Sequence, residues 1–194
     1  MTIALDLKAP ESRVMIARAQ SGDRAALDLV LGALQSPLYR HILAIVRDPD
    51  DARDALQETL MIVARKLPSL REVQWLRAWA YRIATREAVR QTRAARRWRE
   101  AVRGEEALDA LAAPDSGDSF DGATLADAPE LLAALSPASE AVIRMHYIDG
   151  LTHVEIGEAL EIPVGTVKSR LAYGLAAMRQ ATMPGGIFTK VQRP

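Results

Sequence analysis

The sequence predicts an all-α protein made of two small helical domains joined by an acidic flexible linker. Hydrophobic residues make up 49% of the 194 residues, but aromatic residues only 5%. Ala, Leu, Arg and Glu, which favour helices, are abundant, whereas the β-branched and aromatic residues typical of strands are sparse. Apolar residues also recur at spacings of three and four, the period of an amphipathic helix.

The first domain is expected over residues 1–99. Its first two helices should cover residues 11–19 and 24–46, because a Ser-Gly-Asp turn interrupts the apolar pattern between them. A third helix should start after Asp48, whose carboxylate can cap the first backbone amides. That helix should end near Lys66, because a proline follows shortly after it.

Charge divides the chain, although its formal net charge is zero. Residues 77–99 hold eight arginines and one acidic residue, whereas residues 100–130 hold nine acidic residues and one arginine. The acidic stretch is rich in Gly, Pro and Ser and too polar to bury a core. We therefore predict a flexible linker over 100–129 and a loose tail over 183–194. We also hypothesise that the acidic linker covers the arginines in the free protein.

The second domain is expected over residues 130–182 and contains a helix-turn-helix. A Ser-Pro pair opens its first long helix, and an Asp-Gly pair closes it. Thr152 and Glu155 match the S/T-x-x-E capping box, which should start a short helix ending near Leu160. After a tight turn, a last helix should run over residues 164–181.

The start of this last helix has the composition of a DNA recognition helix. It combines a glycine, hydroxyl side chains and cations at the end that would enter a major groove. These residues are Gly165, Thr166, Lys168, Ser169 and Arg170. An ordinary helical hairpin with solvated charges is the alternative, but the capping box and the short turn favour DNA contact.

A second candidate for nucleic-acid binding is a row of arginines on one helix face. They step by four, four, three and four residues: Arg82, Arg86, Arg90, Arg93 and Arg97. Such a face can neutralise phosphates. The preceding Trp75 and Trp79 could stack on unpaired bases. For Trp79, packing in the core is an equal alternative, and the arginines could instead form a solvated face.

A third candidate surface is acidic and lies on the exposed side of the 48–66 helix. It comprises Asp51, Asp54, Gln57 and Glu58. Carboxylates suit a basic protein surface rather than DNA. Because any amphipathic helix has a polar face, a solvated surface is the alternative.

Catalytic, metal-binding and membrane functions find no support in the sequence. The chain has no cysteine and only three scattered histidines, and it has no Gly-rich phosphate loop or nucleophile elbow. No uncharged apolar run approaches the roughly 18 residues that a membrane span needs. We expect a cytoplasmic, non-enzymatic protein with no cofactor, no small-molecule substrate and no membrane insertion.

Four segments, in order, resemble sigma factors of the extracytoplasmic-function (ECF) group of the sigma-70 family. Residues 151–171 (LTHVEIGEALEIPVGTVKSRL) resemble the fourth conserved region of that family. Residues 51–60 resemble the core-binding helix of the second region, residues 75–84 its DNA-melting segment, and residues 19–23 its opening turn. The resemblance covers roughly residues 15–180 and implies a bacterial protein.

The resemblance also implies partners and site residues. The patch over residues 51–58 would bind the coiled coil of the largest subunit of RNA polymerase core. The single strand of the promoter minus-ten element would be held by Arg71, Trp75, Trp79, Arg82, Arg86, Arg90, Arg93 and Arg97. The minus-thirty-five element of promoter DNA would be bound by Arg144, His153, Val164, Gly165, Thr166, Lys168, Ser169, Arg170 and Tyr173. An anti-sigma factor is a further expected partner.

Departures from the family pattern leave the promoter sequence open. Arg86 and Arg90 stand where the family commonly has Asn or Asp, and Ala172 and Tyr173 stand where it often has an aromatic residue and arginines. Glu161 occupies a turn position that is often Gly, which is costly if the backbone there is left-handed. A free-standing helix-turn-helix regulator that dimerises on palindromic sites is the main alternative. A nucleic-acid-processing enzyme is a third class, and it would require a catalytic cluster.

Overall fold

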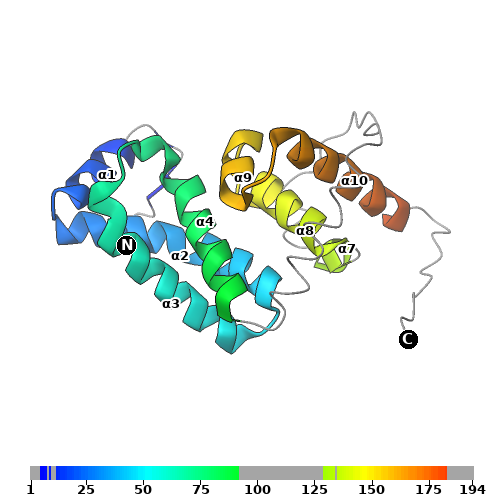
Figure 1. The fold of residues 1–194 in the computed structure, drawn as a ribbon, viewed down its shortest axis with the longest axis horizontal. Coiled ribbons are helices and arrows are strands. Elements are labelled where there is room, and N and C mark those ends of the chain that lie inside the picture. The colour runs from blue at the N-terminus through cyan, green and yellow to red at the C-terminus, as the bar shows by residue number, and fades with distance from the viewer. Residues whose placement is uncertain (1–4, 8, 10–11, 92–128, 134, 183–194) are drawn as a thin grey trace.

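The computed structural model describes residues 5–7, 9, 12–91, 129–133 and 135–182, and these form helices and connecting turns without any strand. Helices α1 to α4 form one bundle and helices α7 to α10 a second bundle beside it (Figure 1). This arrangement confirms the predicted all-α fold. Residues 100–128 of the predicted linker, the predicted tail over 183–194, and Arg93 and Arg97 lie outside the described residues.

Four helices make up the first bundle: α1 (Ser12–Gln20), α2 (Arg24–Val46), α3 (Pro49–Lys66) and α4 (Leu76–Gln91). Helix α2 contacts the other three, and its buried residues recur every four positions as Val30, Leu34, Leu38 and Ile42. Two 3₁₀ turns, Leu67–Ser69 and Val73–Trp75, lead from α3 into α4. The bundle is therefore organised around α2.

The predicted start of α3 is confirmed. The Asp48 carboxylate accepts hydrogen bonds from the backbone N–H groups of Asp50 and Asp51, at 2.9 and 3.0 Å. Asp23 caps α2 in the same way by accepting from the N–H of Ala26 at 3.1 Å. This hydrogen bond and the adjacent Arg18 lower the pKa of the Asp23 carboxyl.

By length and composition, α2 is also the one helix of the described part that could cross a membrane. In the structure, however, its apolar side chains pack inside the bundle against α3 and α4. Soluble core helices pass the same test of length and composition. The apolar character of α2 is accounted for by its central place in the bundle.

The second bundle contains the predicted helix-turn-helix. It consists of α7 (Pro129–Ala133), α8 (Pro137–Ile143), a π-helical turn (Arg144–Ile148), α9 (His153–Leu160) and α10 (Val164–Thr182). The capping box of α9 is complete: the Thr152 hydroxyl accepts from the N–H of Glu155 at 3.2 Å, and the Glu155 carboxylate accepts from the N–H of Thr152 at 2.8 Å. The residues at the start of α9 therefore determine where the first helix of the helix-turn-helix begins.

The turn between α9 and α10 is tight and strained. Glu161 ends α9 in the left-handed region with φ of 58°, which costs a residue with a Cβ atom roughly 1–2 kcal/mol. A Cβ atom at Gly157 would lie 3.0 Å from the backbone oxygen of Ile162. The absence of a side chain at Gly157 is therefore what allows the turn to fold back this closely.

Candidate nucleic-acid and polymerase interfaces

One side of α4 presents cations. Arg86 and Arg90 are exposed and Arg82 is half-buried, whereas Ala84 and Ala88 face the core. We call Arg82, Arg86 and Arg90 the α4 arginine face. Arg90 forms an ion pair with Glu87 one turn earlier, at 2.6 Å. The spacing predicted from the sequence thus does place these three arginines along one side of the helix.

The tryptophans lie at the start of this face. Trp75 is half-buried, and its indole N–H donates to the Glu72 carboxylate at 3.0 Å. Trp79 is also half-buried and packs against the core. Both rings line a cavity of about 360 Å³ that also includes Leu70, Ala78, Arg82 and, from α9, Glu158. Trp79 thus contacts the core, as one of the two alternatives held, and also lines a cavity; its stacking on bases stays a prediction.

The start of α10 is accessible only in part. Val164, Gly165 and Lys168 are exposed, and Tyr173 is half-buried. The other predicted contact residues are buried: Thr166, Ser169 and Arg170, the last only 2% exposed. The Ser169 hydroxyl donates to the Thr166 carbonyl at 3.1 Å. In this conformation the recognition helix offers a single cation, Lys168, within the segment 164–170.

Two further predicted contact residues lie at the start of α9 and in the π-helical turn. The His153 ring lies 4.8 Å from that of His146, and the His146 Nδ1 atom is 2.8 Å from the Leu151 carbonyl oxygen. Burial, together with the charges of His146 and Lys168, lowers the pKa of His153. Arg144 is half-buried and donates to the Glu140 carboxylate at 3.0 Å.

The α3 surface is the most accessible of the predicted sites. Asp51, Asp54 and Gln57 are exposed and Glu58 is half-buried; we call these four residues the α3 patch. Beside it lies a groove of about 430 Å³ whose apolar lining includes Leu31, Leu56, Leu60 and Met61. Charged groups next to exposed apolar side chains are typical of protein-binding surfaces.

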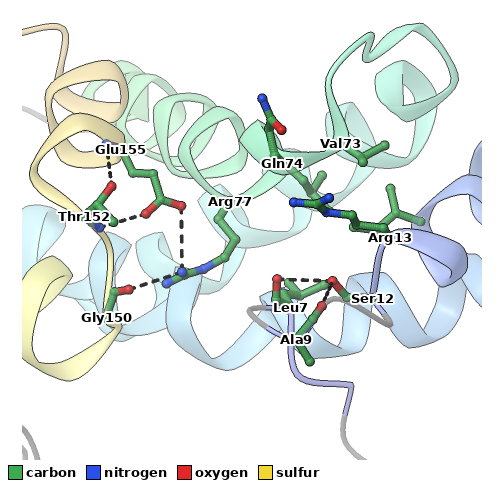
Figure 2. A pocket seen from close by; sticks show the side chains of 12 residues that line it. Leu7, Ala9, Ser12, Arg13, Val73, Gln74, Arg77, Gly150, Thr152 and Glu155 are labelled. Carbon is green, nitrogen blue, oxygen red and sulfur yellow. Dashed lines mark hydrogen bonds and ion pairs between the residues drawn. The ribbon is translucent and has the colours of Figure 1, made fainter.

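The two bundles meet through arginines of the first and acidic groups of the second. Arg77 donates hydrogen bonds to the backbone carbonyls of Asp149 and Gly150. Its guanidinium also lies 3.8 Å from the Glu155 carboxylate. Figure 2 shows the contacts of Arg77 with Gly150 and Glu155. Arg40 forms an ion pair of 2.8 Å with Asp149, whose side chain is only 3% exposed. Arg77, Gly150 and Glu155 border a cavity of about 330 Å³ between the bundles.

Two more ion pairs join the bundles. Arg47, at the end of α2, contacts Glu140 at 2.8 Å. Arg86 of the α4 arginine face contacts Glu161 at the end of α9. These pairs could not be found from the sequence, because no spacing rule relates residues so far apart in the chain.

A buried polar chain also connects α2 with α4. Thr85 donates its hydroxyl hydrogen to the Tyr81 carbonyl at 2.9 Å, so it accepts from the Nε2–H group of His41 at 2.8 Å. Burial, with a smaller effect of the Arg144 guanidinium, lowers the pKa of His41 to about 4. Burial and the nearby Asp149 carboxylate raise the pKa of the Tyr81 hydroxyl. His41 is therefore neutral inside the fold.

Comparison with known proteins decides the family. Residues 31–99 match the model of Sigma-70 region 2, and residues 131–180 match that of Sigma-70, region 4. The ECF RNA polymerase sigma factor SigL of Mycobacterium tuberculosis is 31% identical over 175 residues, covering 86% of this chain and 97% of that protein. The chain belongs to the ECF group of RNA polymerase sigma factors.

Other sigma factors are similar over almost the same length. The RNA polymerase sigma-H factor of Pseudomonas aeruginosa is 26% identical over 184 residues, covering 90% of this chain and 95% of that protein. The sigma factor RpoE in its co-crystal structure with the anti-sigma factor NepR from Bartonella quintana is 25% identical, with a TM-score of 0.56. That match covers 82% of this chain and 96% of RpoE.

In this sigma factor the two matched regions correspond to the two bundles. The α3 patch and the α4 arginine face fall within the region 2 match, and the helix-turn-helix falls within the region 4 match. The structure thus brings α4 of region 2 against α9 of region 4.

Proposed function

We propose that this sigma factor binds RNA polymerase core through the α3 patch and directs it to promoter DNA. The observation that carries the proposal is the combination, in one chain, of an exposed acidic surface on α3, the α4 arginine face and a helix-turn-helix. The α3 patch is exposed and borders an apolar groove, so a basic partner with an apolar ridge can bind it without any rearrangement of the bundle.

The α4 arginine face would hold the melted strand of the minus-ten element. Its cations can neutralise phosphates, and the cavity lined by Trp75 and Trp79 is next to them. Flat rings beside arginines bind unpaired bases by stacking, which contributes about 1–3 kcal/mol per base. Arg71 on the preceding loop is exposed and would extend this surface.

The helix-turn-helix would bind the minus-thirty-five element. Val164, Gly165 and Lys168 at the exposed start of α10 would enter the major groove. Contacts by Thr166, Ser169 and Arg170 would require these buried side chains to become exposed. In this division of labour, residues 1–99 and 130–182 act as two domains, and residues 100–129 link them.

This sigma factor would act by binding alone, in the cytoplasm, and under the control of an anti-sigma factor. The RpoE structure is a complex with the anti-sigma factor NepR, and the two-bundle fold is similar. A partner of the same kind would cover one or both DNA-binding surfaces of this chain.

Transcription by purified components tests the proposal. Polymerase core without sigma factor would be incubated with fragmented genomic DNA of the source bacterium, with and without this protein. We expect discrete transcripts that depend on the protein, and that are lost in the Asp54→Arg/Glu58→Arg variant. A free-standing regulator would give no transcripts with core alone and would instead bind palindromic sites as a dimer.

A further inference from the structure

The exposed start of α10 brings together three residues of different chemistry. Val164, Gly165 and Lys168 are exposed, whereas the remaining residues of the segment 164–170 are buried. Val164 and Lys168 are four residues apart, so they lie on the same side of the helix. The part of this segment that DNA can reach in the structure therefore consists of one apolar side chain, one glycine and one cation.

Val164 is an apolar side chain that the fold leaves partly uncovered. It is 37% exposed at the first position of α10. Its Cγ2 methyl lies 3.6 Å from the position that a Cβ atom of Gly157 would take, so α9 supports the side chain from one side. Branching at the Cβ atom also restricts its rotamers. Val164 therefore presents a well-defined apolar surface where the proposed function places DNA.

The glycine at position 165 is not required by the fold. Its φ lies outside the left-handed region, unlike that of Gly22 and Gly150. A Cβ atom added to it would meet no atom of the described residues within 4 Å, apart from its own helical turn. At Gly157, by contrast, such an atom would lie 3.0 Å from the Ile162 carbonyl oxygen. Because glycine lowers the stability of a helix relative to alanine, its presence at position 165 is explained if a partner approaches the helix closely.

The C5-methyl of thymine is the apolar group that base edges present in the major groove. We propose that the start of α10 is a thymine-reading subsite, in which Val164 contacts this methyl group and Gly165 lets the base edge approach the helix. The inference rests on the proposed function and deepens it, because it names a base that the minus-thirty-five element must contain. Lys168, on the same side one turn further along, would add a phosphate contact.

A uracil interference experiment tests the methyl contact. Promoter fragments that support transcription with this protein would carry uracil at random in place of some thymines, which removes only the C5-methyl group. Fragments bound by holoenzyme, the complex of polymerase core with this sigma factor, would be separated from free fragments and cleaved at uracil. A thymine whose methyl group is contacted is one at which uracil is depleted from the bound fraction.

With wild type we expect such a thymine in the minus-thirty-five element, and a single uracil there should weaken binding about fourfold, the effect of burying one methyl group. With Val164→Ala the same uracil should have little effect, because the methyl group has already lost its contact. Val14→Ala, which truncates a valine that is 67% exposed on α1, should keep the wild-type pattern. An unchanged pattern with Val164→Ala, or no sensitive thymine in the element, would overturn the inference.

Gly165→Ala tests the close approach of the base edge. The variant should melt at the wild-type temperature or up to about 3 °C higher, because the added Cβ atom meets open space and alanine favours the helix. Holoenzyme that contains it should nevertheless bind the same promoter fragments roughly tenfold more weakly, because the Cβ atom would crowd the base edge. Promoter binding with wild-type affinity by Gly165→Ala would overturn the inference.

The same measurements distinguish a failure of the subsite from a failure of the proposed function. If wild-type holoenzyme binds no promoter fragment, the proposed function itself is refuted. If it binds, and the substitutions at Val164 and Gly165 leave the affinity and the uracil pattern unchanged, the thymine-reading subsite is refuted and the proposed function stands. Loss of the uracil effect in Val164→Ala together with weaker binding by a fully stable Gly165→Ala is the result that we expect.

Discussion

Lowering the pH should destabilise the first bundle through His41. The neutral imidazole donates to Thr85 in a fully buried site, and protonation would place a charge there. Burial keeps the pKa of His41 near 4 in the folded chain, whereas an unfolded histidine has a pKa of about 6.5. The unfolded state therefore binds the proton first as the pH falls.

The sign and size of the effect follow from this difference. The stabilising contribution of neutral His41 is complete above pH 6.5, decreases as the pH falls below that value, and is lost by about pH 4. A pKa difference of this size corresponds to about 3 kcal/mol of unfolding free energy. Arg144 of the second bundle adds to the shift, so separation of the bundles should raise the pKa of His41.

Urea unfolding monitored by tryptophan fluorescence measures this contribution, because all three tryptophans precede residue 99. His41→Gln keeps an amide donor near the Nε2 position but does not titrate. We expect the variant to lose about 3 kcal/mol less stability than wild type between pH 7 and pH 4. His153→Gln, at a half-buried site, should remove less of the pH dependence. Parallel pH profiles for wild type and His41→Gln would refute the reasoning.

Three further predictions concern the helix-turn-helix and α4. Thr152→Ala should lower the unfolding free energy of the second bundle by about 1 kcal/mol, measured by circular dichroism, whereas Thr152→Ser should not, because the serine hydroxyl still caps α9. Gly174→Ala should cost roughly 1 kcal/mol net, because its Cβ atom would lie 3.0 Å from Cγ1 of buried Ile143; in an Ile143→Ala background the added cost should disappear. Arg90→Ala should weaken the salt dependence with which the polymerase complex binds single-stranded DNA. In a plot of the logarithm of the binding constant against the logarithm of the salt concentration, the slope should become smaller by about 0.7, and an unchanged slope would exclude a phosphate contact.

Local patterns in the sequence predict the helices well. Asp48 and Thr152 determine where α3 and α9 begin, and the structure contains the predicted hydrogen bonds at both caps. The helix-turn-helix follows from the capping box and the short turn, and the left-handed Glu161 lies at the position where a cost was expected. These features depend on neighbours within a few residues, so they can be read from the sequence.

The contact between the bundles could not be predicted in this way. The pairs Arg40–Asp149 and Arg86–Glu161 join residues 109 and 75 positions apart, and no spacing rule relates them. The sequence also presented Arg170 as a surface cation, whereas it is buried in the structure, because the composition of a helix start does not show which of its side chains are covered. The role of each predicted contact residue in DNA binding stays a prediction.

Comigration with RNA polymerase core in size-exclusion chromatography tests the central claim most directly. Wild type should comigrate with core that lacks a sigma factor, and Asp54→Arg/Glu58→Arg should not, because the reversed charges would repel a basic partner at the exposed α3 patch. Asp28→Arg/Glu130→Arg, which reverses two exposed acidic residues elsewhere, should bind core as wild type does. Absence of wild-type binding, or binding that survives the reversal on α3, would contradict the account.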